Sequence, residues 1–277
     1  MAKDLEKNAS GVVLALIEKI SNAIGYIYDP NGLIPANREF TSYFAKTIAQ
    51  DTNLSPEEKF AINAEMNVLM KKNNNRKDII EKTISKLDSN SKPIQISDDW
   101  MFDFWEKAGA IHNEELKNLW SNIFIHELNN PSSVSKRLLH NVSIMSHKDA
   151  LDFVDFTKFC FYDTVHIDLA HPIIFIKDNE DMYNRFGITT QILHKLEQYS
   201  LIETNYDVGF AYKNKKRFLY TNCYITLEAK IIPAGYVQLT EDGQVLLSVV
   251  DKINSTKILD FIINTWYKKG VNVKIEK

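Results

Sequence analysis

The sequence predicts a mainly α-helical protein that ends in a smaller part with a β-sheet. Through the first 160 residues, apolar side chains recur at three- and four-residue spacing, as they do on the buried face of a helix. From about residue 163 the pattern changes to alternation and to short apolar runs, which are typical of strands. With 277 residues, 44% of them hydrophobic, the chain can bury one large core or two modest ones.

The amino-terminal helical region is predicted to span residues 1–92. Its first helix carries an apolar stripe over residues 13–27 and stops at the Asp-Pro-Asn-Gly segment 29–32, and a second helix is expected at 35–50. Ser55-Pro56-Glu57-Glu58 predicts the start of a third helix, because serine caps it and Glu58 closes a capping box. Residues 71–93 are rich in Asn, Ser and Lys, which indicates a mobile connection and the first boundary.

A central helical block is predicted at 93–162. Its aromatic residues, among them Trp100, Trp105 and Trp120, recur at helical spacing, and large rings in such a pattern usually fill a core. One helix is expected to end before Pro131, since a residue that precedes proline is disfavoured in the helical conformation. A capping box at residues 146–149 then predicts a helix that continues to Cys160.

Residues 163–250 follow the order of a winged-helix module. Alternation from residue 163 and the apolar run 173–176 predict a strand or extended chain. A short helix begins near Thr190 and leads through residues 201–202 into a strand. Hairpin strands are expected at 210–217 and 218–227, and Thr240 is placed to cap the next helix. We expect the strand before Thr240 to pair with the hairpin, which completes a winged-helix-like arrangement.

The closing segment, residues 251–277, is predicted to form an amphipathic helix that stops at Gly270 and a short strand after it.

The composition argues against several classes of protein. The net charge is only −3, so the chain as a whole is not a basic nucleic-acid binder, and any such binding must come from a local patch. Cys160 and Cys223 are too far apart for a zinc motif and too few for a disulfide scaffold, which fits a reducing cytoplasm. The apolar run 11–17 is too short to span a bilayer. We expect a cytoplasmic protein.

The sequence contains no complete catalytic motif. His126-Glu127 begins like a helical zinc-protease motif, but Asn130 stands where the second histidine is required. The nine glycines are scattered and form no dinucleotide loop, no phosphate loop and no nucleophile elbow. Cys160, between two phenylalanines, is interpreted as a buried structural thiol. We therefore expect no catalytic residues, no metal, no cofactor and no enzyme activity.

Two alternatives stay open at this point. Asp163, His166, Asp168 and His171 mix groups that can bind a metal or transfer protons, so a metal-dependent hydrolase is one alternative. A membrane-acting effector that uses the amphipathic helix within residues 1–30 is the other, although the polar face of that helix lacks the expected excess of Lys and Arg.

The best localised binding feature is a basic run in the expected hairpin. Lys213, Lys215, Lys216 and Arg217 stand without an acid among them, and cations at a hairpin tip can contact a phosphate backbone. In the helix expected at the recognition position, Gln191 and Lys195 are candidates for nucleic-acid contact. The sequence therefore predicts that the winged-helix-like part contacts nucleic acid or a protein partner, while the helical part forms an oligomer or senses a partner.

Several segments resemble a family of bacterial proteins of unknown function. They are residues 17–30, Asp98-Asp99-Trp100, residues 113–120, Pro131-Ser132-Ser133 and residues 239–243. Through its Glu-Leu-x-x-Leu-Trp and Pro-Ser segments this family is similar to the abortive-infection alpha proteins. The resemblance implies a bacterial or phage-related cytoplasmic protein that acts in defence against phage, and it supplies no catalytic residues.

Overall fold

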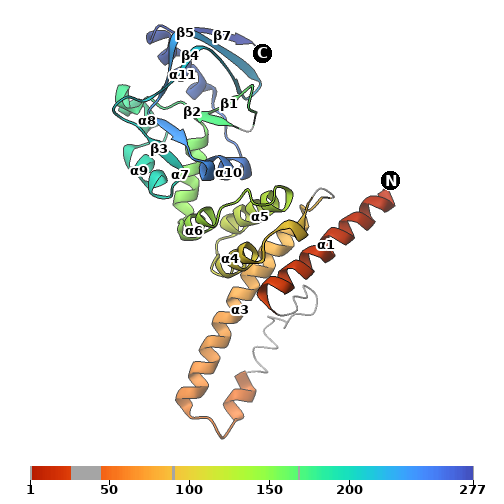
Figure 1. Cartoon of the computed structure of the whole chain (residues 1–277). Coiled ribbons are helices and arrows are strands. Elements are labelled where there is room, and N and C mark those ends of the chain that lie inside the picture. The colour runs from red at the N-terminus through yellow and green to blue at the C-terminus, as the bar shows by residue number, and fades with distance from the viewer. Residues whose placement is uncertain (1, 26–44, 89–90, 168, 277) are drawn as a thin grey trace. The chain divides into compact units, whose positions relative to one another are not determined.

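The computed structural model describes residues 2–25, 45–88, 91–167 and 169–276, without the side chains of residues 2–10. The chain divides into two compact units, residues 1–143 and 144–277. The division falls inside the predicted central block, so that helix α7 (His147–Thr157) belongs to the second unit. Figure 1 shows helices in the described parts of the first unit, and both helices and strands in the second. A mainly α-helical fold with a small sheet, as the sequence predicts, is therefore confirmed.

The described helices of the first unit pack around an aromatic core. Trp100, Phe104 and Phe124 form a run of stacked and tilted rings, and Trp120 lies against Phe104. The elements are α1 (Ala2–Ile24), α3 (Pro56–Ile84), the 3-10 helix η1 (Pro93–Gln95), α4 (Asp98–Ala108), α5 (Glu114–Asn129) and α6 (Lys136–Ile144).

The first helix packs as the sequence predicts. In α1, Leu16 and Ile20 of the apolar stripe are fully buried, and the helix lies against α4 and η1. The predicted helix end at 29–32, and most of the helix expected at 35–50, lie outside the described residues.

The mobile connection predicted at residues 71–93 is wrong, because α3 continues through the three asparagines to Ile84. Tertiary contacts stabilise this part of the helix: the Asn75 side-chain amide donates to the Gly109 carbonyl, and Arg76 Nε donates to the Trp105 carbonyl. Arg76 is 4% exposed and also pairs with Glu106 at 2.7 Å. Polar residues in this segment thus bind other helices instead of solvent.

The second unit combines five helices, one 3-10 turn and two sheets among its described residues. Its helices are α7 (His147–Thr157), the 3-10 helix η2 (Ile176–Asp178), α8 (Glu180–Arg185), α9 (Thr190–Gln198), α10 (Glu241–Val249) and α11 (Thr256–Lys268). Its strands are β1 (Cys160–Asp163), β2 (Ala170–Pro172), β3 (Ile202–Thr204), β4 (Phe210–Tyr220), β5 (Cys223–Gly235), β6 (Val237–Leu239) and β7 (Asn272–Glu276).

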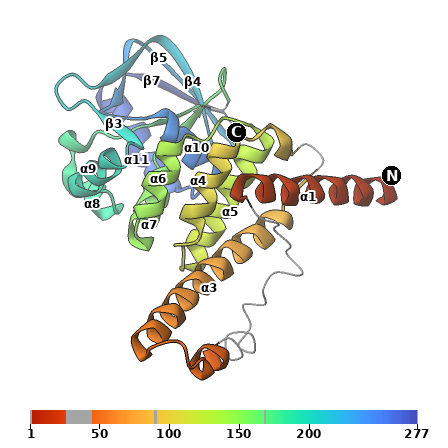
Figure 2. The ribbon, with the colours of Figure 1, turned by 60° about the horizontal axis from the view of Figure 1, so that its bottom comes forward.

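The larger sheet is antiparallel, with the strand order β2-β1-β4-β5-β7. Helix α11 covers one of its faces (Figures 1 and 2). The Trp266 ring of this helix stacks on Phe218 and meets Phe161 edge to face, and all three side chains are fully buried. The opposite face carries the alternate, more polar residues of the same strands.

Strands β3 and β6 form a separate antiparallel pair. The expectation that the strand before Thr240 pairs with the hairpin is therefore wrong: β6 pairs with β3, and the β4–β5 hairpin emerges between them along the chain. The predicted caps at Ser55, Ser146 and Thr240 are confirmed, as is the helix end before Pro131.

The segment predicted as strand or extended chain from residue 163 is a strand only in part, because β1 ends at Asp163, a loop follows, and β2 begins at Ala170. Val165 and Ile167 are 79% and 73% exposed, so the apolar half of the alternating pattern does not face a core. Likewise the helix expected to reach Cys160 ends at Thr157, and Cys160 opens β1 as a buried thiol.

Candidate nucleic-acid interface

The predicted basic run lies along strand β4 and not at the hairpin tip. The turn between β4 and β5 is formed by Thr221 and Asn222, and Thr221 has a positive φ of 56°. Because side chains alternate along a strand, the four cations do not form one cluster. Lys215 and Arg217 share a face with Leu219, whereas Lys216 shares the opposite face with Phe218.

We define the outward face as the side of the larger sheet opposite α11. Cross-strand register places its residues in rows, because directly opposed residues share a face. One row holds Tyr162, Leu219, Tyr224 and Glu276, the next Arg217, Thr226 and Lys274, and the third Lys215, Glu228 and Asn272.

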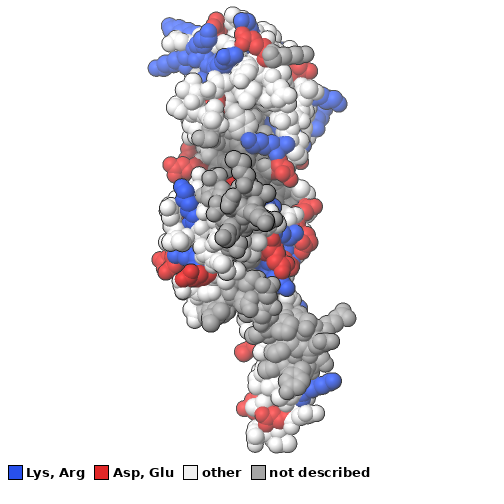
Figure 3. All heavy atoms as spheres, turned by 90° about the vertical axis from the view of Figure 1, so that its right-hand side faces the viewer, with Lys and Arg blue, Asp and Glu red and all other residues white. Residues whose placement is uncertain are grey.

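The cations of the outward face take part in exposed ion pairs. Lys215 pairs with Glu228 at 2.8 Å, Arg217 with Glu276 at 2.7 Å, and Lys274 with Glu276 at 2.9 Å. The lysine side chains are 65% and 73% exposed, and these partners lower the pKa of Glu228 and Glu276. Figure 3 shows Lys and Arg side chains, with acids among them, at the top of the second unit.

Lys213 lies beyond an irregularity in the β4–β5 register. The shift falls between Lys213 and Asn214, and Asn214 has a positive φ of 65°. Lys213 is exposed, and among the described residues it has no ion-pair partner. Lys213 therefore continues the series of β4 cations beyond the three rows of the outward face.

Lys216 points inward and binds a buried carboxylate. Its ammonium pairs with Asp163, which is 2% exposed and also accepts hydrogen bonds from the backbone N–H groups of Val165 and His166. Burial alone raises the pKa of Asp163, but Lys216 and the backbone donors lower it more, to about 2. Lys216 therefore has a structural role in the sheet.

The two candidates on α9 differ in the same way. Gln191 is exposed. The Lys195 side chain is 46% exposed and pairs with Asp149 of α7, whose side chain is 3% exposed. Burial raises the pKa of Asp149, but the hydrogen bonds from Lys195, Ser146 and Tyr199 outweigh this effect and lower the pKa to about 2. Among the residues predicted for nucleic-acid contact, Lys213, Lys215 and Arg217 therefore lie along one strand, Gln191 lies on α9, and Lys195 and Lys216 anchor buried acids.

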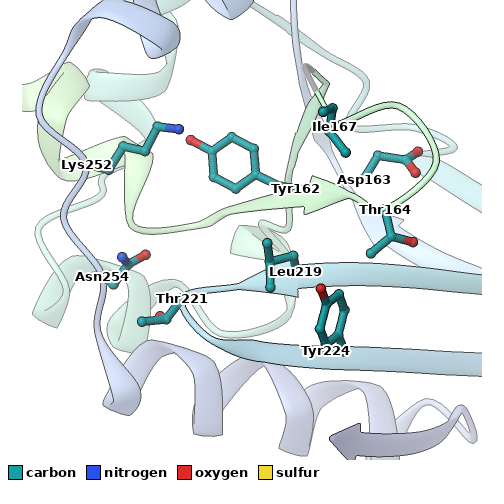
Figure 4. A pocket seen from close by; sticks show the side chains of 9 residues that line it. All are labelled: Tyr162, Asp163, Thr164, Ile167, Leu219, Thr221, Tyr224, Lys252 and Asn254. Atoms are coloured by element: carbon teal, nitrogen blue, oxygen red, sulfur yellow. The ribbon is translucent and has the colours of Figure 1, made fainter. Parts of the chain in front are cut away.

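A hollow of about 360 Å³ lies at one end of the outward face. Figure 4 shows Leu219 between Tyr162 and Tyr224, with the Lys252 ammonium beside the Tyr162 ring. Lys252 Nζ is 4.2 Å from the centre of that ring, and the Arg217 guanidinium is 4.4 Å from the centre of the Tyr224 ring. Two aromatic rings, each with a cation beside it, thus line an open surface.

Of the four residues considered for a metal site, Asp163 and His171 lie close together. His171 Nε2 lies 3.5 Å from Asp163 Oδ2, but His166 is exposed in the β1–β2 loop and Asp168 lies outside the described residues. Burial lowers the pKa of His171, and the Lys216 charge lowers it further. Within the described ranges, no group of three or more His, Cys, Asp and Glu side chains is arranged to hold a metal ion.

None of the described helices has both the length and the apolar character that a membrane span requires.

Comparison with known proteins gives one match, to a family model described as a protein of unknown function (DUF2806), over residues 62–258. The chain belongs to the DUF2806 family. The matched range runs from within α3 to the first turn of α11, so in this DUF2806 protein the match covers part of each unit. No curated protein and no solved structure matches the chain.

Sequence reasoning missed Tyr162, Tyr224, Lys252 and Lys274 of this DUF2806 protein. Alternation contained part of the signal: Tyr224, Thr226 and Glu228 alternate with apolar residues along β5, and Lys274 lies between Val273 and Ile275. Lys252 joins the surface only through the loop before α11, which no local pattern indicates.

Proposed function

We propose that the protein is a non-enzymatic nucleic-acid-binding protein whose second unit makes the contact. The observation that carries the proposal is the basic strip of β4 and β7, in which Lys213, Lys215, Arg217 and Lys274 are exposed on or beside one sheet. Between residues 211 and 230 the chain has five cations and one acid. This local excess stands out in a chain whose net charge is −3.

The ion pairs of this strip do not prevent binding. Exposed ion pairs contribute little to stability, since water and salt screen them. A phosphate group offers the same cations another anionic partner, and each neutralised phosphate releases counterions, which favours association. The cations can therefore exchange Glu228 and Glu276 for phosphates at small cost.

We also propose that the part of this unit from α9 to α10 is a winged-helix-like module. In chain order, α9, β3, the hairpin, β6 and α10 follow the sequence of elements in that module, and the β3–β6 pair stands at the base of the long β4–β5 hairpin. The hairpin then corresponds to an enlarged wing, which makes contact along its strand instead of its tip. A protein partner, or a second copy of the chain, is the alternative ligand.

The test compares two triple variants by fluorescence polarisation with labelled oligonucleotides over a range of salt concentrations. Changing Lys213, Lys215 and Arg217 to Ala removes the β4 cations of the strip, while Lys216 is kept because it holds Asp163. Changing Lys148, Lys257 and Lys268 to Ala removes the same charge from exposed helix positions of the same unit. We expect the first variant alone to weaken binding and to reduce the salt slope by about 2–3.

Equal binding by both triple variants contradicts the role of the strip. An absence of binding by the unaltered chain contradicts the proposed function. In that case light scattering, which measures the oligomeric mass, tests the alternative of a second copy.

We propose phage defence as the biological setting, supported by the resemblance of the family to abortive-infection alpha proteins. The test is the efficiency of plating of a phage panel on bacteria that express the chain, with the strip variant as the matched control. Protection that the strip variant loses supports both parts of the proposal. Equal plating with and without the chain, across the panel, contradicts the defence role.

A further inference from the structure

We infer that the ligand of the outward face is a single-stranded nucleic acid, which stacks its bases on Tyr162 and Tyr224. This inference rests on the proposed function and names the class of nucleic acid. It depends on the rings and the shape of the surface, whereas the proposed function depends on the charge alone.

Aromatic rings and cations are paired on the outward face. Tyr224 is 40% exposed and has the Arg217 guanidinium over its ring, and Tyr162 has the Lys252 ammonium over its ring. Proteins that bind single strands combine a positively charged track for the backbone with aromatic platforms for the bases. Both parts are present here within three neighbouring strands, β1, β4 and β5.

The surface beside the rings is hollowed. The hollow is lined by Tyr162, Leu219, Tyr224, Thr221, Lys252 and Asn254, and its volume of about 360 Å³ is within the range of small-molecule pockets. A second depression lies along the face over Lys215, Arg217 and Lys274. A base can therefore lie against a ring while its phosphates follow the cations.

The tyrosine rings favour single strands over duplexes. In a duplex the faces of the bases are stacked on one another and cannot meet a tyrosine ring, so a duplex must be read through its grooves. The helix available for a groove is α9, whose Lys195 is held by Asp149. Only Gln191 of the predicted helix candidates stays exposed without such an anchor. The outward face is thus better suited to unpaired bases.

The test measures binding of the full chain to labelled 20-nucleotide oligo(dT) and oligo(U) and to a 20-base-pair duplex. We expect single strands to bind at least about tenfold more tightly than the duplex, with the two oligonucleotides distinguishing DNA from RNA. Tyr224→Ala is expected to weaken single-strand binding about tenfold, which is the usual effect of removing one stacking platform. Tyr224→Phe keeps the ring and should keep the affinity.

Phe60→Ala is the matched control, since Phe60 is an exposed ring of the first unit, 77% exposed, and should not affect binding. Photocrosslinking of 4-thiouracil oligonucleotides, with the crosslinked residues mapped by mass spectrometry, gives a readout on the unaltered chain if Tyr224→Ala disturbs the sheet. Crosslinks on β1, β4 or β5 are expected.

Two failures are distinguishable. A chain that binds neither single strands nor duplex contradicts the proposed function. A chain that binds duplex as well as single strands, or single strands with crosslinks confined to α9, contradicts this inference alone.

Discussion

The buried pair of Asp163 and Lys216 makes stability depend on pH in a defined direction. Asp163 has a pKa of about 2 in the folded protein, below its ordinary value of 3.8. A lowered pKa means that the folded state favours the ionised carboxylate, so its contribution is complete above about pH 4 and is lost as the pH falls toward 2. The difference between the two pKa values corresponds to about 2.5 kcal/mol.

Asp163→Asn removes this contribution and leaves Lys216, with a side chain 21% exposed, facing a neutral amide. We expect the variant to lose about 2.5 kcal/mol of unfolding free energy at pH 7 and to differ little from the unaltered protein near pH 2. Hydrogen exchange of β1 and β4 amides at increasing urea concentration reports the unfolding of this unit alone.

Glu276→Gln is the control, because the Arg217–Glu276 pair is exposed on the outward face and should leave stability unchanged at both pH values. Equal stability of Asp163→Asn and the unaltered chain at pH 7 would refute the reasoning. A variant deficit that stays constant from pH 7 to pH 2 would refute the assignment of the pH dependence to Asp163.

Three further predictions concern packing and reactivity. Arg76→Ala should cost about 3 kcal/mol in urea denaturation, because it leaves the Trp105 carbonyl and Glu106 without their partner, and Arg76→Lys should cost less; an Ala variant as stable as the unaltered chain would contradict this. Gly243→Ala should destabilise the second unit by more than about 2 kcal/mol, since a Cβ there would lie 1.9 Å from the Leu201 carbonyl oxygen. Gly11→Ala is the control and should be neutral or slightly stabilising, because no atom lies near the added Cβ. Similar melting curves for the two variants would argue against the close contact. Iodoacetamide should label Cys223 in the folded protein but reach Cys160 only after unfolding, because Cys160 is buried and burial raises the pKa of its thiol. Mass spectrometry of the labelled peptides measures this, and equal labelling of the two cysteines in the folded protein would contradict it.

Features that depend on neighbours in sequence could be predicted from the sequence. The caps at Ser55, Ser146 and Thr240 and the helix end before Pro131 are local, because each depends on a hydrogen bond or a steric clash within a few residues. The glycine stop after α11 is of the same kind, with Gly270 at a φ of 76°. The fold class follows from many such signals together.

Features that depend on distant residues could not be predicted. Asn75 and Arg76 continue α3 because they bind the Gly109 and Trp105 carbonyls about 30 residues away. The β4–β5 turn was missed because Thr221 and Asn222 provide it without a glycine, inside a stretch with strand-like composition.

The candidate site shows the same limit. The basic run itself was visible, but which of its cations faces solvent depends on the strand alternation and on Asp163, which lies 53 residues before Lys216 and binds it. The tyrosines of the outward face come from strands separated by about 60 residues of chain. Only the register of the sheet brings them onto one surface.

The strand pairs of the second unit differ in the length of chain between the two paired strands, and this difference indicates the order in which the pairs form. The β4–β5 hairpin closes across two residues, whereas β3 meets β6 across a 32-residue span and β7 joins β5 from the far side of two helices. Loop-closure entropy favours the short connection, and hairpins form within microseconds. The hairpin is therefore expected to form first and to act as the template on which β1 and β7 later dock, so that the outward face is assembled around β4, the strand that carries two of the three cations in its rows.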